Sequence, residues 1–185
     1  TVTKADQAAL TVSANPMTIT SGGAGSMLST SGGSTNGTVT YAANTASGTV
    51  SCNISGNTLT ATGGAGSCSV TATMAGNSNY NDVTSAAITV NVTKQTQAAL
   101  TVLANPTSIT SGGTGSALST SGGSTNGTVT YAATPLSGSV NCSISGSTLT
   151  ATGGAGSCSV TATMAADGNY NAITSAAISV TVKVQ

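Results

Sequence analysis

Apolar and small polar residues alternate along most of this chain, with the period of two that a β-strand requires. Clusters of Gly, Ser and Asn interrupt the alternation at intervals of roughly ten residues, and such clusters are typical of turns. We find no stretch with the spacing of an amphipathic helix. The pattern therefore predicts an all-β protein made of short strands, in a sandwich or a barrel.

The first half of the chain shows the alternation most plainly, and there it predicts eight strands. These lie at residues 8–13, 16–20, 26–30, 38–43, 49–54, 57–62, 67–73 and 86–92. The inward positions form runs such as Cys68, Val70, Ala72 and Met74, with Ser or Thr between them. Ser55-Gly56-Asn57 predicts a tight hairpin turn, and residues 63–66 another. The longest predicted loop is 75–85.

The chain is one unit of 90 residues written twice. Residues 3–92 align with residues 93–182 without a gap; 21 of the 90 pairs differ, which leaves 69 identical. We predict two tandem β-sandwich domains, 1–92 and 93–185. Repetition of this kind is typical of proteins that build length or display one surface several times.

Charge is nearly absent from the sequence. Charged residues make up 3%, the net charge is zero, and there is no Arg, Glu or His. This composition gives no basic surface for nucleic acid. No apolar run approaches the length of a membrane span, so we expect no membrane insertion. A surface without self-repulsion favours association between copies, or a covering of glycan.

Each copy holds one pair of cysteines, Cys52 with Cys68 and Cys142 with Cys158, all at inward positions of predicted strands. Inward cysteines on two strands of a small sandwich can meet across its core. We therefore predict the disulfides Cys52–Cys68 and Cys142–Cys158, each worth roughly 3 kcal/mol of stability. Buried free thiols are the alternative. Disulfides would place the chain in an oxidising, extracellular setting.

The segments 59–63 and 66–73, the Asn79-Tyr80-Asn81 loop and the strand 85–90 resemble the bacterial immunoglobulin-like (Big-type) tandem repeats of large cell-surface and adhesin proteins. The same run recurs at 149–180. The resemblance implies immunoglobulin-like β-sandwiches, with Tyr41 and Tyr131 in the core, and a role in stalks, fibres or adhesins. Related repeats are usually more charged, and this difference favours a packed or glycosylated assembly.

The junction at residues 93–99 contains no Gly and no Pro. A short join without flexible residues predicts an extended, stiff rod. By the 90-residue offset, the first two residues match the end of a preceding repeat and the last three match the start of another. We therefore expect further copies of the repeat in a longer chain, or end-to-end continuation into a neighbour.

The residues that catalysis needs are missing. No His can act as a general base, no acids are paired at matched positions, and nothing could activate the many Ser and Thr hydroxyls. Two cysteines per repeat cannot complete a zinc site, and three scattered Asp cannot form a calcium site. We expect no enzyme, no metal and no cofactor.

Two groups of residues are candidate surface sites. Tyr80 and Tyr170 either pin the long loop onto their own sandwich or pack against a neighbouring domain or subunit. Asn-x-Ser/Thr glycosylation motifs occur at Asn36, Asn53, Asn91, Asn126 and Asn141. O-linked sugar on Ser and Thr would be an equal alternative. The outward Thr rows need no further function, since Thr is common in strands.

The sequence thus predicts a structural, non-enzymatic extracellular protein of a bacterial surface, forming a stiff stalk, fibre or filament by self-association or in a longer array. The alternative is an adhesin-type module that binds glycan or a host protein through its loops. Differences between the copies cluster at 44–46 and 76–78. We expect loops at both places, and these are where an adhesin would recognise its ligand.

Overall fold

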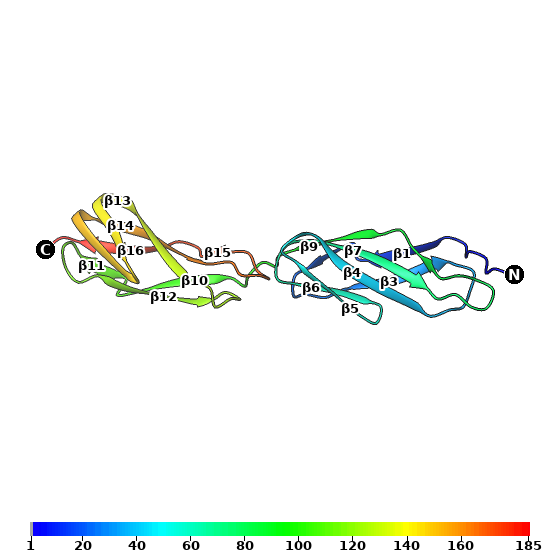
Figure 1. The fold of residues 1–185 in the computed structure, drawn as a ribbon. Coiled ribbons are helices and arrows are strands. Elements are labelled where there is room, and N and C mark those ends of the chain that lie inside the picture. The colour runs from blue at the N-terminus through cyan, green and yellow to red at the C-terminus, as the bar shows by residue number, and fades with distance from the viewer. Residues whose placement is uncertain (1) are drawn as a thin grey trace. The chain divides into compact units, whose positions relative to one another are not determined.

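A computed structural model describes residues 2–185, and these residues form strands, turns and bends without any helix (Figure 1). The chain divides into two compact units, of which the first ends at Gln95 and the second is Thr96–Gln185. The sequence-based division at 92/93 lies three residues earlier. The protein is therefore all-β, and each unit is described below by itself.

The described residues of unit 1 form nine strands in two sheets. They are β1 (Leu10–Asn15), β2 (Thr18–Thr20), β3 (Ser26–Gly32), β4 (Val39–Gly48), β5 (Ser51–Ser55), β6 (Thr58–Thr62), β7 (Gly66–Met74), β8 (Val83–Thr84) and β9 (Ile88–Thr93). One sheet has the order β1-β3-β6-β5, and the other has the order β2-β9-β7-β4 with β8 paired to β7. Among the pairs of named strands in unit 1, β2 and β9 are parallel and the others are antiparallel.

Unit 2 repeats this arrangement with longer continuous strands. They are β10 (Leu100–Asn105), β11 (Ser108–Thr110), β12 (Ser116–Gly122), β13 (Val129–Ser145), β14 (Thr148–Met164), β15 (Ile173–Thr174) and β16 (Ile178–Lys183). β13 covers the positions of β4 and β5, and β14 those of β6 and β7. Both strands bend through register shifts, after Pro135 and after Gly138. The two layers of unit 1 are therefore joined into one seven-stranded sheet in unit 2.

The core lies between the layers and is built from aliphatic side chains of modest size. Leu59, Cys68, Val70 and Val90 are fully buried in unit 1, and their counterparts 90 residues later are fully buried in unit 2. The inward positions predicted from the alternation are buried or half-buried, as predicted. Tyr41 packs against this core and donates from its hydroxyl to the Leu28 carbonyl at 3.5 Å. A sandwich-like fold therefore follows from the alternation directly.

The eight strands predicted for the first copy are all present, with bounds that move by up to five residues. The prediction of a loop at 44–46 was wrong, because β4 continues through these residues to Gly48. Their side chains are all exposed, and a register shift lies between Thr45 and Ser47. The strand extends here by pairing with the start of β7 without burying any side chain, so no apolar alternation marks it. The two-residue strand β8 was also missed, inside the predicted loop 75–85.

Candidate functional site

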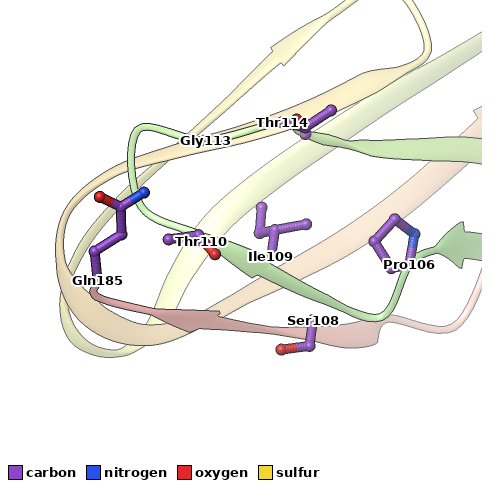
Figure 2. A pocket seen from close by; sticks show the side chains of 8 residues that line it. Pro106, Ser108, Ile109, Thr110, Gly113, Thr114 and Gln185 are labelled. Carbon is purple, nitrogen blue, oxygen red and sulfur yellow. The ribbon is translucent and has the colours of Figure 1, made fainter.

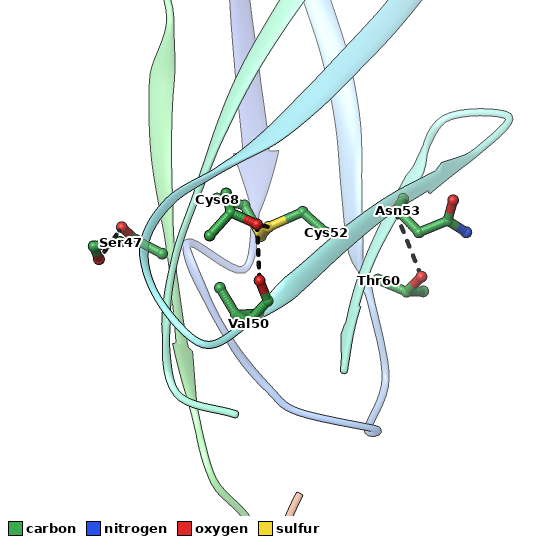
Figure 3. The surroundings of a disulfide bond; sticks show 8 residues. Ser47, Val50, Cys52, Asn53, Thr60 and Cys68 are labelled. Carbon is green, nitrogen blue, oxygen red and sulfur yellow. Dashed lines mark hydrogen bonds between the residues drawn. A yellow bond between two sulfur atoms is a disulfide. The ribbon is translucent and has the colours of Figure 1, made fainter. Parts of the chain in front are cut away.

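The disulfide of each unit joins its two layers. Cys52 lies on β5, the edge strand of one sheet, and Cys68 lies on β7, inside the other (Figure 3). Their Cα atoms are 5.9 Å apart, and those of Cys142 and Cys158 are 6.0 Å apart. The described structure therefore pairs all four cysteines as the inward pattern predicted. Since such bonds persist in oxidising compartments, they indicate a setting outside the cytoplasm.

Hydroxyl groups hold the chain that leads into Cys52. The Thr45 hydroxyl donates to the Val50 carbonyl at 2.8 Å, and the hydroxyl oxygens of Ser47 and Ser67 are 2.8 Å apart (Figure 3). Unit 2 keeps the serine pair as Ser137 and Ser157, 2.7 Å apart. Pro135 stands where unit 1 has Thr45, so the first of these bonds cannot form there. The serine pair is therefore the hydrogen bond near the disulfide that both units share.

Gln7 is a buried polar side chain that the hydrophobic alternation does not mark. Its Nε2 donates to the carbonyls of Met74, Ala75 and Asn81 at 3.3, 3.4 and 2.8 Å. Its Oε1 accepts from the Ser34 backbone N–H at 3.0 Å and from the Thr35 hydroxyl at 3.2 Å. One side chain therefore ties the entering chain to both neighbouring loops. The signal in the sequence was a Gln kept at the same place in both copies.

Gln97 has the same role in unit 2. Its Nε2 donates to the carbonyls of Ala165 and Asn171 at 3.1 and 2.8 Å, and its Oε1 accepts from the Ser124 N–H at 3.1 Å. Gln97 is 4% exposed and Gln7 is 9% exposed. The junction segment is therefore anchored by its own side chain, in addition to lacking Gly and Pro.

Tyr80 and Tyr170 lie half-buried in the loop after β7 and after its counterpart in β14. In unit 1 the Asn77 Oδ1 accepts from the N–H groups of Asn79 and Tyr80 at 2.8 and 3.0 Å. In unit 2 the Asp167 Oδ1 accepts from Asn169 and Tyr170, both at 2.8 Å. The loop around each tyrosine is thus fixed within its own unit, and each tyrosine stays partly accessible.

The five asparagines of the glycosylation motifs all have exposed side chains. Asn53 lies on β5, and Asn141 lies two positions earlier on the matching part of β13. Asn36 and Asn126 lie in matching loops before β4 and β13, and Asn91 lies on β9. Each is therefore sterically open to modification.

The chain enters and leaves unit 1 at opposite ends. Ala5 pairs with Tyr80, in the loop that follows β7. At the exit, the Ser21 N–H donates to the Thr93 carbonyl at 2.8 Å, and the Gly64 N–H donates to the Ser21 hydroxyl at 3.2 Å. Gly64 precedes β7, whose nine residues span about 30 Å. Entry and exit are therefore separated by the length of a strand.

A shallow hollow of about 380 Å³ lies beside β11 in unit 2. Figure 2 shows Ile109 and Thr110 between Pro106 on one side and Gln185 on the other. Its remaining lining residues are Ser108, Gly113, Thr114 and Gly115. None of these side chains is charged or titratable near neutral pH. The hollow can therefore offer hydroxyl and amide contacts.

Within residues 2–185, no three His, Cys, Asp or Glu side chains gather closely enough to hold a metal ion. Across the same residues, no helix has the length and apolarity to cross a bilayer. All four cysteines are in disulfides, which removes the thiol as a nucleophile. The features brought together in each unit are thus a disulfide between the layers, an anchored entry segment and a surface with few charges.

No protein-family model matches the chain, and no curated protein sequence matches it either.

Proposed function

We propose that this chain is a structural, non-enzymatic protein of the bacterial cell surface, working as part of a stiff stalk, fibre or filament. The observation that carries the proposal is that the chain enters and leaves unit 1 at opposite ends. Units joined in series need this arrangement to gain length with every copy. The near-verbatim repetition of the unit supports the same conclusion.

The strand order supports an immunoglobulin-like class for each unit. That fold packs a sheet of the order A-B-E-D against a sheet containing strands C, F and G. In unit 1, β1-β3-β6-β5 takes the places of A-B-E-D, and β9-β7-β4 takes those of G-F-C. The short β2 beside β9 completes the second sheet. This likeness rests on topology alone, and fold does not by itself imply function.

The parallel pair of β2 and β9 suits a unit under tension. Thr18, Ile19 and Thr20 pair with Asn91, Val92 and Thr93. Tension on the entering chain draws β2 toward the entry end, while tension on the leaving chain draws β9 toward the exit end. All hydrogen bonds of the pair are then loaded together instead of one after another. The disulfide also keeps residues 52–68 from extending.

Electron microscopy of the native material under non-reducing conditions tests the proposal. Regular filaments whose axial repeat matches two units would make the chain a self-assembled subunit. Thin rods of variable length would make it a segment of a longer stalk. Compact particles with neither axial order nor extended shape would contradict both forms of the proposal.

The alternative, an adhesin-type module that recognises glycan or a host protein, draws support from the loop at 76–78, where the copies differ. All three residues of the matching stretch 166–168 are exposed. A glycan array probed with the folded full chain tests this alternative. Specific hits that disappear when residues 76–78 and 166–168 are replaced by other residues would favour the adhesin. An array without hits would count against it.

A further inference from the structure

The named strands of both units carry one charge, Lys183 at the end of β16, so the sheet surfaces are almost uncharged. The surface considered in each unit is called the outer face: the outward side chains of β1, β3, β5 and β6 in unit 1, and of their counterparts β10, β12 and the matching parts of β13 and β14 in unit 2. All six charged residues lie outside these strands. They are Lys4, Asp6, Asp82, Lys94, Asp167 and Lys183. An ordinary solvated face would carry several charges, since about a quarter of residues are charged in typical domains.

The hydroxyls of the outer face bind to each other across strands. The hydroxyl oxygens of Thr11 and Ser31 are 2.7 Å apart, and those of Ser13 and Ser29 are 2.8 Å apart. In unit 2 the oxygens of Thr101 and Ser121 are 2.6 Å apart. Such side chains are short, so they lose little conformational entropy on burial. They also keep a hydrogen-bond partner when water leaves, which lowers the cost of covering the face.

Each outer face holds one large exposed apolar side chain, but at different positions. Unit 1 has Met27, 57% exposed, and unit 2 has Leu103, 56% exposed. The position of Met27 is Ala117 in unit 2, and the position of Leu103 is Ser13 in unit 1.

These two positions are diagonal neighbours on the sheet. Ser13 pairs with Ser29, two residues along β3 from Met27, and Leu103 pairs with Ser119, two residues along β12 from Ala117. Unit 1 thus places its large apolar side chain on β3, and unit 2 places its own on β10, the strand that pairs with the counterpart of β3. Two separate differences keep one apolar contact point in one small area, which is expected where that area is covered by a partner.

We propose that the outer face is the surface by which one copy of this chain docks on a second copy. The partner is assigned as a second copy because a neutral face offers nothing to a charged partner, while two neutral hydroxyl-rich faces can cover each other without burying a charge. Where the outer face of unit 1 in one copy docks on that of unit 2 in the other copy, Met27 can contact Ala117 and Leu103 can contact Ser13. This inference rests on the proposed function and names its contact surface.

The size of the face fits this role. Four strands spaced about 4.8 Å apart, each some six residues long, present about 400 Å² of sheet. A specific interface buries about 800 Å² on each partner. One outer face therefore falls short, and the two faces of one chain together reach that size. We expect association that needs both units and that depends strongly on concentration.

The first experiment measures self-association of the full chain by sedimentation velocity over a range of concentrations. The double substitution Met27→Ala with Leu103→Ser removes both apolar contact points. Each change copies the residue that the other unit has at that position, so folding is preserved. Leu136→Ala is the matched control, because Leu136 is 61% exposed, lies away from the outer face, and is Ala46 in unit 1.

We expect the double variant to associate at least about tenfold more weakly, and Leu136→Ala to associate like the parent chain. A second pair of variants places charge on each surface. Ser29→Lys with Ser119→Lys adds two charges to the outer faces, and Thr89→Lys with Ser179→Lys adds two to the exposed positions of β9 and β16. Only the first pair should prevent association.

The outcomes separate the two proposals. A parent chain that associates, with outer-face variants that associate equally well, would overturn the docking surface and leave the structural role standing. Loss of association with the control variants alone would place the contact on the other sheet. A parent chain that stays monomeric at every concentration and forms neither filaments nor rods would overturn both.

Discussion

Units 1 and 2 share every buried side chain and differ only where water reaches them. None of the 21 differing positions is buried in either unit, and most are exposed in both. The core of this small sandwich contains no Phe or Trp. A substitution that changes the volume of a core side chain therefore has few large neighbours that could repack around it. The comparison teaches that the shared core specifies the unit, while the differences between the copies lie outside it.

The variation on the surface is itself constrained. Unit 1 has Ser51 and Asn53 where unit 2 has Asn141 and Ser143, so each keeps one exposed Asn on the same edge strand. The loop after β7 has Asn77 and Asp82 in unit 1, and Asp167 and Ala172 in unit 2. Each loop therefore keeps one acid. Each unit thus keeps one Asn on the edge strand and one Asp in the loop, although the position of each differs between the units by a few residues.

The largest effect is expected in the core. Leu59→Ala and Leu149→Ala each remove a fully buried side chain. Each should lower the free energy of unfolding by about 2–5 kcal/mol. Because the two sites have identical surroundings, the two losses should agree within about 0.5 kcal/mol. Urea unfolding of the full chain, followed by circular dichroism, will show the altered unit as an earlier transition with half the amplitude. Losses that differ by several kcal/mol would break the equivalence of the cores.

The disulfides come next. Replacing Cys52 and Cys68 together by Ala should cost about 3 kcal/mol, and the same change at Cys142 and Cys158 should cost the same. Both loops close a separation of 16 residues. The parent chain unfolded in a reducing agent is the control, and it should lose stability in both units. A reduced parent chain as stable as the oxidised one would show that the disulfides add nothing to the free energy of unfolding.

Gln7→Ala should cost about 1–3 kcal/mol, because it leaves several buried carbonyl and N–H groups without their partner. Gln97→Ala should act equally in unit 2. Gln95→Ala is the matched control, since its Nε2 makes one bond, to the Ser21 carbonyl at 2.8 Å, and it should cost less. Hydrogen exchange of residues 75–82 provides a second measurement. Equal costs for Gln7→Ala and Gln95→Ala would argue against a special role for the buried amide.

The smallest effect concerns the exchanged acids. Asn77→Asp alone should change stability by less than about 0.5 kcal/mol, since Asp167 makes the same two bonds in unit 2. It also places a second acid in the loop with Asp82, whose Oδ1 accepts from the Gly76 N–H at 2.7 Å. Adding Asp82→Ala should then cost less than it does in the parent chain. A double-mutant cycle measures this coupling, and its absence would mean that the loop tolerates two acids.

The alternation predicted most of this fold because it records which side chains face inward. Runs such as Cys68, Val70, Ala72 and Met74 fix both the strand and its buried side, and with them the pairing of the cysteines. The alternation did not predict the strand at residues 44–46, because a strand exposed on both sides shows no alternation of apolar and polar residues. β8 escaped because two residues are too few to show a period.

The anchoring role of Gln7 could not be predicted in the same way. Its partners lie 27 to 74 residues away, in two loops whose meeting depends on the completed sandwich. The parallel pairing of β2 with β9 also depends on the assembled sheet, since three residues carry no mark of direction. Local pattern thus predicts strands and faces, while long-range polar contacts require the folded chain.

The placement of the lysines has a consequence for how the protein breaks down. With no Arg, a trypsin-like protease has only Lys4, Lys94 and Lys183 as targets. Lys94 stands just after β9, and no basic residue interrupts the strands between Leu10 and Thr93 or between Leu100 and Val182. Proteolysis of the folded chain concentrates at accessible segments outside packed elements. Digestion would therefore release whole sandwiches rather than fragments, and a fibre built from this chain would shorten unit by unit.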